Sequence, residues 1–121
     1  MNHLPPGERD AVVHDLRLAC ERTDAPALHT LLSPDVVALV DTGGDLLAPT
    51  RPLEGVAAVA DALLATLSTA DVTEQQVNGV RALVARRGGR VVAIVSLEVA
   101  HGRAIRVWIT LSPLKLQRWN T

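Results

Sequence analysis

The sequence predicts an α+β domain in which three helices pack on one face of a mainly antiparallel sheet. Two observations favour this class: apolar residues recur at helical spacing in the first half of the chain, and three glycine-containing turn signals divide the second half. With 121 residues, 48% of them hydrophobic, the chain is large enough to bury a core of its own. We therefore expect one domain over residues 1–121.

Three segments have the pattern of helices. Between residues 6 and 22, apolar residues recur every three or four positions, with acidic residues near the start. Asp24 has the side chain of an N-cap for a short second helix up to residue 32, which Ser33 and Pro34 should end. Residues 55–67 carry an unbroken apolar stripe and predict the third helix.

A hairpin is expected between the second and third helices. Residues 35–41 form an apolar, β-branched run, and the turn signal Thr42-Gly43-Gly44 follows. Residues 45–48 should then return as a short strand that Pro49 and Pro52 end.

Four longer strands should follow the third helix, over residues 71–77, 80–87, 90–100 and 104–112. The turn signals between them are Asn78-Gly79, Gly88-Gly89 and His101-Gly102. Asn78-Gly79 has a second interpretation, a bulge inside one long strand.

The last two predicted strands are apolar on both faces. Residues 90–100 have mainly apolar side chains in both alternating sets, whereas in the next strand the set Ile105, Val107, Ile109 and Leu111 should meet the helices. A semi-apolar outer face favours a homodimer, with Trp108 near the middle of the interface. The alternative is a single exposed Trp108 on a monomer. The expected interface residues are Ile94, Glu98, Arg106, Trp108 and Thr110.

Composition excludes several classes of function. Twelve basic residues against 13 acidic ones, with no dense basic block, argue against nucleic-acid binding. No apolar run is long enough for a membrane span or a signal peptide, and the single Cys20 suits a reducing compartment, so we expect a cytoplasmic protein. The histidines have no metal-ligand spacing, and Lys115 is the only lysine and lies in no phosphate-binding loop, so we expect no metal, no cofactor and no nucleotide hydrolysis.

Five short motifs carry a resemblance to a known family. They are Asp35-Val36-Val37 leading to Asp41-Thr42-Gly43-Gly44, then Arg51-Pro52-Leu53-Glu54-Gly55, Val77-Asn78-Gly79, Gly102-Arg103, and Ser112-Pro113-Leu114-Lys115-Leu116. In order and spacing these motifs resemble the SnoaL-like domain at the C-terminus of extracytoplasmic-function sigma factors, which has a nuclear transport factor 2-like fold. Family members commonly have Asp-Gly-Gly-Gly at the first motif and Asn-Pro-Asp-Lys-Leu at the last. Leu114 therefore replaces the acidic residue of the tail.

The resemblance implies a cone in which a curved sheet wraps around the helices and leaves an apolar cavity. The residues expected to line this cavity are Leu16, Cys20, His29, Asp41, Arg51 and Leu63. The sigma modules that bind DNA and polymerase are absent from this sequence, so promoter binding is not expected.

Asp41 is the leading candidate for chemistry. A carboxylate beside an apolar cavity would have a raised pKa and could transfer protons, whereas an Asp before Gly commonly accepts backbone N–H groups in its own turn. Arg51 could meet Asp41 as an ion pair or lie free in solvent. Glu98 and Arg106 should be near-opposite on neighbouring strands and pair on the outer face, although an acid–Arg–acid set with Asp41, as in epoxide hydrolases of this fold, is an alternative.

The sequence therefore predicts a non-catalytic regulatory module that binds a small apolar ligand or a protein partner. The alternative is a cofactor-free isomerase, a polyketide-cyclase-like enzyme or an epoxide-hydrolase-like enzyme that uses Asp41 as acid or base. An oxyanion site of the ketosteroid isomerase kind would need a Tyr, and the chain contains neither Tyr nor Phe.

Overall fold

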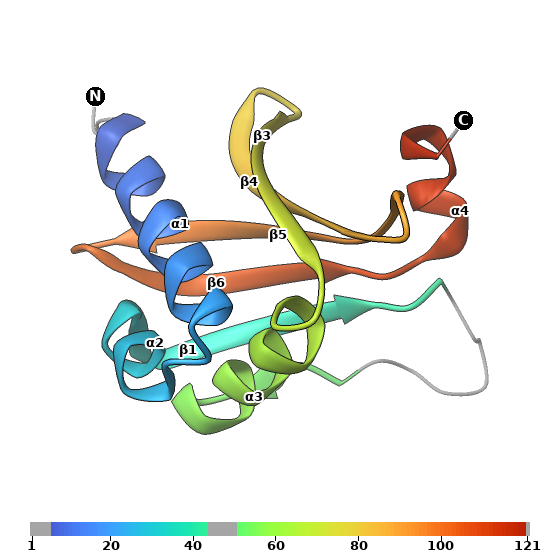
Figure 1. The fold of residues 1–121 in the computed structure, drawn as a ribbon. Helices are drawn as coiled ribbons and strands as arrows, with labels where there is room; N and C mark the ends of the chain where they lie inside the picture. Colours follow the sequence, from blue (N-terminus) through green and yellow to red (C-terminus); the bar gives the residue numbers. More distant parts are fainter. Residues whose placement is uncertain (1–5, 44–50, 121) are drawn as a thin grey trace.

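A computed structural model describes residues 6–43 and 51–120 and confirms the predicted α+β class. Six strands form one curved sheet in the order β2-β1-β6-β5-β4-β3, in which only β1 and β6 pair in parallel among the described strands (Figure 1). The strands are β1 (Leu32–Asp41), β2 (Leu53–Glu54), β3 (Asp71–Val77), β4 (Val80–Arg87), β5 (Arg90–Ala100) and β6 (Arg103–Thr110).

The three predicted helices are present and pack against one face of this sheet (Figure 1). They are α1 (Pro6–Glu21), α2 (Ala25–Leu31) and α3 (Val56–Leu67). The side chain of Asp24 accepts a hydrogen bond of 3.1 Å from the backbone N–H of Ala27, so it caps α2 as expected. The core between helices and sheet is aliphatic, built from fully buried residues such as Leu16, Leu63 and Val95.

Ser33 and Pro34 do not separate helix from strand, which corrects the sequence prediction. β1 begins at Leu32, directly after α2, and runs through both residues. Its register against β6 shifts between Leu32 and Val37, so the missing N–H of Pro34 falls where the ladder is already irregular. The expected returning strand at 45–48 lies outside the described residues, and the observed antiparallel partner of β1 is Leu53–Glu54.

The second half of the chain forms the four predicted strands. Asn78 and Gly79 have φ values of 53° and 79° and join β3 to β4 as a tight turn, which excludes the alternative of a bulge in one strand. β6 ends at Thr110 rather than at residue 112. Ile105 is an extra residue in the β5–β6 ladder, because Glu98 pairs with Arg106 while Val99 pairs with Ala104, and Ile105 is therefore only half-buried.

A short C-terminal segment was not predicted. After β6, the helix α4 (Pro113–Leu116) and the 3₁₀ turn η1 (Gln117–Trp119) follow, capped at the start by the buried Ser112. Leu116 and Trp119 pack on Val84, Val91 and Ile94, on the sheet face opposite the helices. A four-residue helix has no periodicity to detect, which explains why the sequence pattern missed it.

No helix among the described residues combines the length and the apolar character that crossing a bilayer requires.

Candidate functional site

Of the six residues expected to line an apolar cavity, the structure places three in the packed core and two at the surface. Leu16, Cys20 and Leu63 are at most 1% exposed and belong to the packed core. Burial raises the pKa of the Cys20 thiol to about 12, so this thiol stays neutral and unreactive. His29 and Arg51 are exposed.

Asp41 joins the end of β1 to the C-terminal segment. Its Oδ1 accepts a hydrogen bond of 3.0 Å from the backbone N–H of Gly43, and its Oδ2 pairs with Nζ of Lys115. Its backbone carbonyl accepts a hydrogen bond of 2.7 Å from the N–H of Leu111. The hydrogen bonds from Lys115 and Gly43 lower the pKa of Asp41, so its side chain is a carboxylate at neutral pH.

Gly43 is needed where these two segments meet. Its φ of 103° is unfavourable for other residues, and a Cβ there would lie 3.1 Å from Oγ of Ser112. The first and last motifs that carry the family resemblance therefore contact each other in space. The Asp41–Lys115 pair thereby joins the C-terminal segment to the end of β1.

This arrangement supports the turn interpretation of Asp41 over an acid–base role. A general acid or base at neutral pH needs a raised pKa, whereas the pKa of Asp41 is lowered and its side chain is 36% exposed. The ionic partner of Asp41 is Lys115 and not Arg51.

The acid–Arg–acid set does not assemble. Glu98 and Arg106 are direct cross-strand partners, as expected, but within the described residues no ion pair joins them. Arg106 lies opposite Val37 and Asp41 lies opposite Thr110, so Asp41 is four positions, or about 13 Å, along the strand from Arg106. In the described ranges, no group of three or more His, Cys, Asp or Glu side chains is arranged to hold a metal ion.

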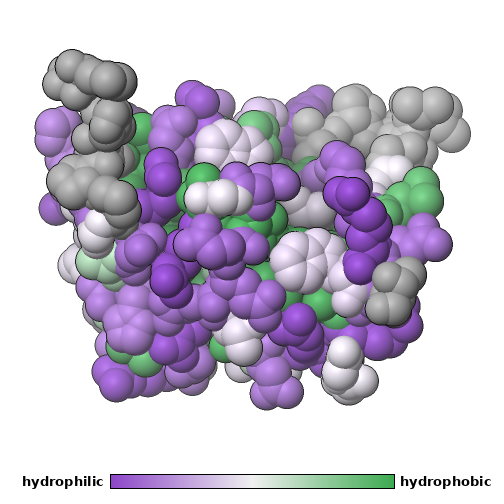
Figure 2. Space-filling view, turned by 90° about the horizontal axis from the view of Figure 1, so that it is seen from above, coloured by the Kyte–Doolittle hydropathy of each residue, from purple (hydrophilic) through white to green (hydrophobic). Residues whose placement is uncertain are grey.

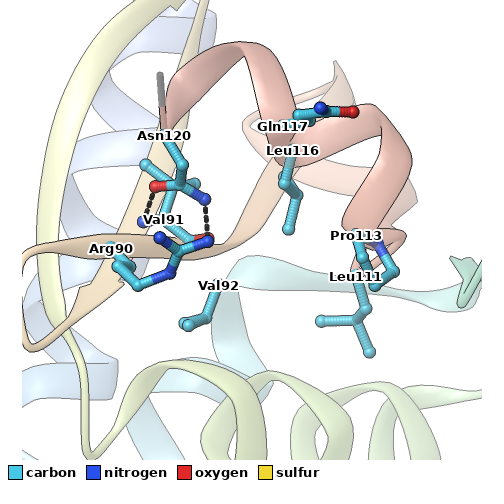
Figure 3. Close-up of a pocket in the computed structure, with 8 residues that line it drawn as sticks. All are labelled: Arg90, Val91, Val92, Leu111, Pro113, Leu116, Gln117 and Asn120. Atoms are coloured by element: carbon cyan, nitrogen blue, oxygen red, sulfur yellow. Dashed lines mark hydrogen bonds between the residues drawn. The ribbon is translucent and has the colours of Figure 1, made fainter.

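A cavity lies beyond the end of β6, between the C-terminal segment and β5, and we call it the C-terminal groove. It has a volume of about 460 Å³ and is lined by Arg90, Val91, Val92, Leu111, Pro113, Leu116, Gln117 and Asn120. In Figure 3 the side chains of Val92, Leu111 and Leu116 converge on the space between the C-terminal segment and α3, while Arg90 lies at its side and Gln117 points away from it.

Asn120 joins the C-terminal segment to β5 at one side of this groove. Its side-chain Oδ1 accepts from the N–H of Val91 at 2.7 Å, and its Nδ2 donates to the carbonyl of Val91 at 3.0 Å (Figure 3). β6 ends opposite Ile94, so the backbone of Val91 has no strand beside it on that side. The amide of Asn120 therefore replaces the missing strand and satisfies both backbone groups.

A second, smaller hollow of about 200 Å³ lies beside the groove and shares Val92 and Leu111 with it. Its other lining residues are Ala65, Thr66, Arg87 and Ala93. Val92 reaches this side because it is a bulge in the β4–β5 ladder, where Ala85 pairs with Ala93 but Arg86 pairs with Val91.

The outer face of the sheet, opposite the helices, is partly covered by the C-terminal segment and partly exposed. Ile94, an expected interface residue, is buried beneath the chain's own C-terminal segment. Trp108 and its cross-strand neighbour Leu39 are 36% and 38% exposed, and Leu114 is 77% exposed. A hollow of about 410 Å³ lies between Trp108, Leu39 and the Asp41–Lys115 pair. Figure 2 shows that hydrophobic atoms reach the surface in patches among hydrophilic side chains on the side seen from above.

Comparison with solved structures identifies the fold as nuclear transport factor 2-like, as in SnoaL-like proteins. An NTF-2 like protein of unknown function from Burkholderia xenovorans LB400 matches with a TM-score of 0.63 and 11% identity over 95% of this chain and 94% of that chain.

The expected likeness to a sigma-factor domain is confirmed at the level of fold. The extracytoplasmic function sigma factor SigJ of Mycobacterium tuberculosis matches with a TM-score of 0.68 and 24% identity over 90% of this chain, which spans 44% of the length of SigJ. An LEH-like epoxide hydrolase of M. tuberculosis matches with a TM-score of 0.57 and 15% identity over 93% of this chain and 88% of the hydrolase. No protein-family model and no curated protein sequence matches this chain.

The sequence reasoning missed the residues that build the groove. Val92 and Leu111 fall inside predicted strands and Arg90 begins one, while no sequence pattern points to Asn120. The available signal was the Gly88-Gly89 turn between two arginines, which places both side chains at one end of the sheet.

Proposed function

We propose that this chain is a non-catalytic, SnoaL-like regulatory module that binds a small apolar ligand in the C-terminal groove. The observation that carries the proposal is the groove itself: at about 460 Å³ it falls in the size range of small-molecule sites, and Val92, Leu111 and Leu116 make its lining mainly aliphatic.

The state of Asp41 favours binding over catalysis. The alternative of a cofactor-free isomerase, cyclase or epoxide hydrolase needs an acid or base beside the ligand, and Asp41 is a charged carboxylate paired with Lys115 outside the groove. The groove lining itself contains amide and guanidinium groups but no carboxylate, imidazole or thiol.

We also propose that two copies pair through the outer face. Trp108 and Leu39 supply exposed apolar surface, and Glu98 and Arg106 lie beside them without pairing to each other. Across a two-fold axis, Glu98 of one copy would face Arg106 of the other, which makes this surface complementary to itself. The reduced, buried Cys20 is consistent with the cytoplasm as the place where the module acts.

Binding in the groove can be tested with an uncharged fluorescent probe, N-phenyl-1-naphthylamine. We expect saturable binding to the wild-type protein and at least about tenfold weaker binding to Val92→Phe, because the larger side chain fills the groove. Ala11→Phe, which adds the same ring to the exposed side of α1, is the matched control and should bind like wild type. Equal binding by all three proteins would contradict the proposal. Heteronuclear NMR spectra of each variant confirm that it is folded.

A further inference from the structure

We propose that the ligand of the C-terminal groove is an amphipathic anion, a carboxylate on an apolar body, and that Arg90 with Arg87 binds its charged end. This inference rests on the proposed function and specifies the chemical class of the ligand. It follows from where the structure places two arginines relative to an aliphatic cavity.

Arg87 and Arg90 lie directly opposite each other at the end of the β4–β5 hairpin, with Gly88-Gly89 between them. Arg90 lines the C-terminal groove and Arg87 lines the neighbouring hollow. Because Val92 and Leu111 line both spaces, the groove and the hollow share an apolar wall, with Arg90 lining the first space and Arg87 the second. A ligand lying on this wall would have its head group within reach of both arginines.

The two arginines have no acidic partner in the part of the chain that the structure describes. Arg87 donates one hydrogen bond of 2.8 Å, from Nη2 to Oγ1 of Thr69, which fixes its side chain and leaves its other N–H groups available. Arg90 has no ion pair or hydrogen bond from its side chain to a described residue. Neither space is lined by Asp or Glu, so the local charge is positive although the whole chain carries a formal charge of −1.

The arginines and the aliphatic lining together define the chemical class of the ligand. Guanidinium groups bind carboxylates through paired N–H donors. This interaction is stronger where apolar walls reduce the access of water. The aliphatic side chains of Val92, Leu111 and Leu116 bury an alkyl or alicyclic body but offer no hydrogen bonds to it. A neutral molecule of the same shape would fill the groove but would form no ion pair with the arginines.

The test compares decanoate with decanol, which differ only at the head group. The affinity of each compound is measured by its competition with N-phenyl-1-naphthylamine. The proteins compared are the wild type, Arg90→Gln and the double variant Arg87→Gln, Arg90→Gln. We expect decanoate to bind the wild type about tenfold more tightly than decanol, and the advantage should disappear in the double variant and fall with added salt. Decanol binding should not change.

Arg103→Gln is the matched control, because Arg103 is also exposed but begins β6 at the opposite end of the β5–β6 hairpin. It should leave the binding of both probes unchanged. If decanol and decanoate bind equally and the arginine variants change neither, the groove binds apolar ligands but the anion inference is wrong. If neither competes with the naphthylamine probe, or the probe itself does not bind, the proposed function fails as well.

Discussion

Glu74 shows how a single side chain can stabilise the contact between a helix and the sheet. On β3, its carboxylate accepts hydrogen bonds of 2.8 Å from both Nδ1 of His14 and Nε of Arg17 on α1, and Nη1 of Arg81 lies 3.9 Å away. Burial alone raises the pKa of Glu74, but the hydrogen bonds from His14 and Arg17 outweigh it, so the pKa is lowered from its ordinary value of 4.5.

We predict that Glu74→Gln lowers the free energy of unfolding by about 1–2 kcal/mol at neutral pH, because charge-assisted hydrogen bonds are lost. A carboxylate with a lowered folded-state pKa stabilises the protein above its unfolded-state pKa and loses that contribution as pH falls through the folded-state value. The difference between wild type and variant should therefore shrink as the pH falls below the ordinary Glu value of 4.5 and through the lower folded-state pKa of Glu74. Urea unfolding at several pH values measures it.

Glu21→Gln is the control for this prediction. Glu21 pairs only with Arg17 among the described residues, at 2.7 Å, and its side chain is 42% exposed, so its removal should have little effect. A constant difference between wild type and Glu74→Gln across the acid range would show that the Glu74 charge contributes nothing.

At the scale of elements, the C-terminal segment depends on its junction with β1. Gly43, Asp41 and Ser112 make this junction, and Asn120 fixes the far end of the segment to Val91. The segment also supplies Leu116 to the groove and to the small cluster on the outer face. Its position therefore decides both the shape of the groove and how much of the sheet stays uncovered.

We predict that Gly43→Ala destabilises the protein by about 1–2 kcal/mol, because the φ of 103° is unfavourable for alanine and the added Cβ would lie 3.1 Å from Ser112 Oγ. The amide of Leu116 should also exchange with solvent faster. Gly7→Ala, in the first turn of α1 with no atom within 4 Å of the new Cβ, should be neutral or slightly stabilising. Equal effects of the two substitutions would contradict the assigned role of Gly43.

At the scale of the whole molecule, the helices cover one face of the sheet and the C-terminal segment covers part of the other. What stays open on that second face includes Trp108 and Leu39. Burying the exposed apolar area of these side chains would stabilise a pair of molecules by about 25 cal/mol per Å² before the cost of association.

We predict that the wild-type protein is a dimer at tens of micromolar and that Trp108→Glu converts it to a monomer. A buried charge would face its own copy across the two-fold axis, which opposes association. Size-exclusion chromatography with light scattering measures the change, and Ala11→Glu on the exposed side of α1 is the charge-matched control. A monomeric wild type at this concentration would disprove the interface.

The elements that the sequence predicted well share one physical property: each is defined by residues close together in the chain. The apolar stripe of α3, the Asp24 cap of α2 and the Asn78-Gly79 turn depend on spacing and backbone preference over a few positions. The prediction at Pro34 is wrong because the strand accommodates this proline at the irregular register between β1 and β6, which no local sequence pattern indicates.

By itself, the sequence predicted an α+β class with an aliphatic core, because the hydrophobic periodicity favours helices on one face of a mainly antiparallel sheet. Its short motifs, and not the periodicity, carried the resemblance to SnoaL-like domains. Only the tertiary structure showed which residues come together at the candidate site. Asp41 meets Lys115 across 74 positions of sequence, and Asn120 meets Val91 across 29. These contacts depend on strand order, on bulges at Val92 and Ile105, and on where β6 ends, and no local pattern of side chains encodes these features.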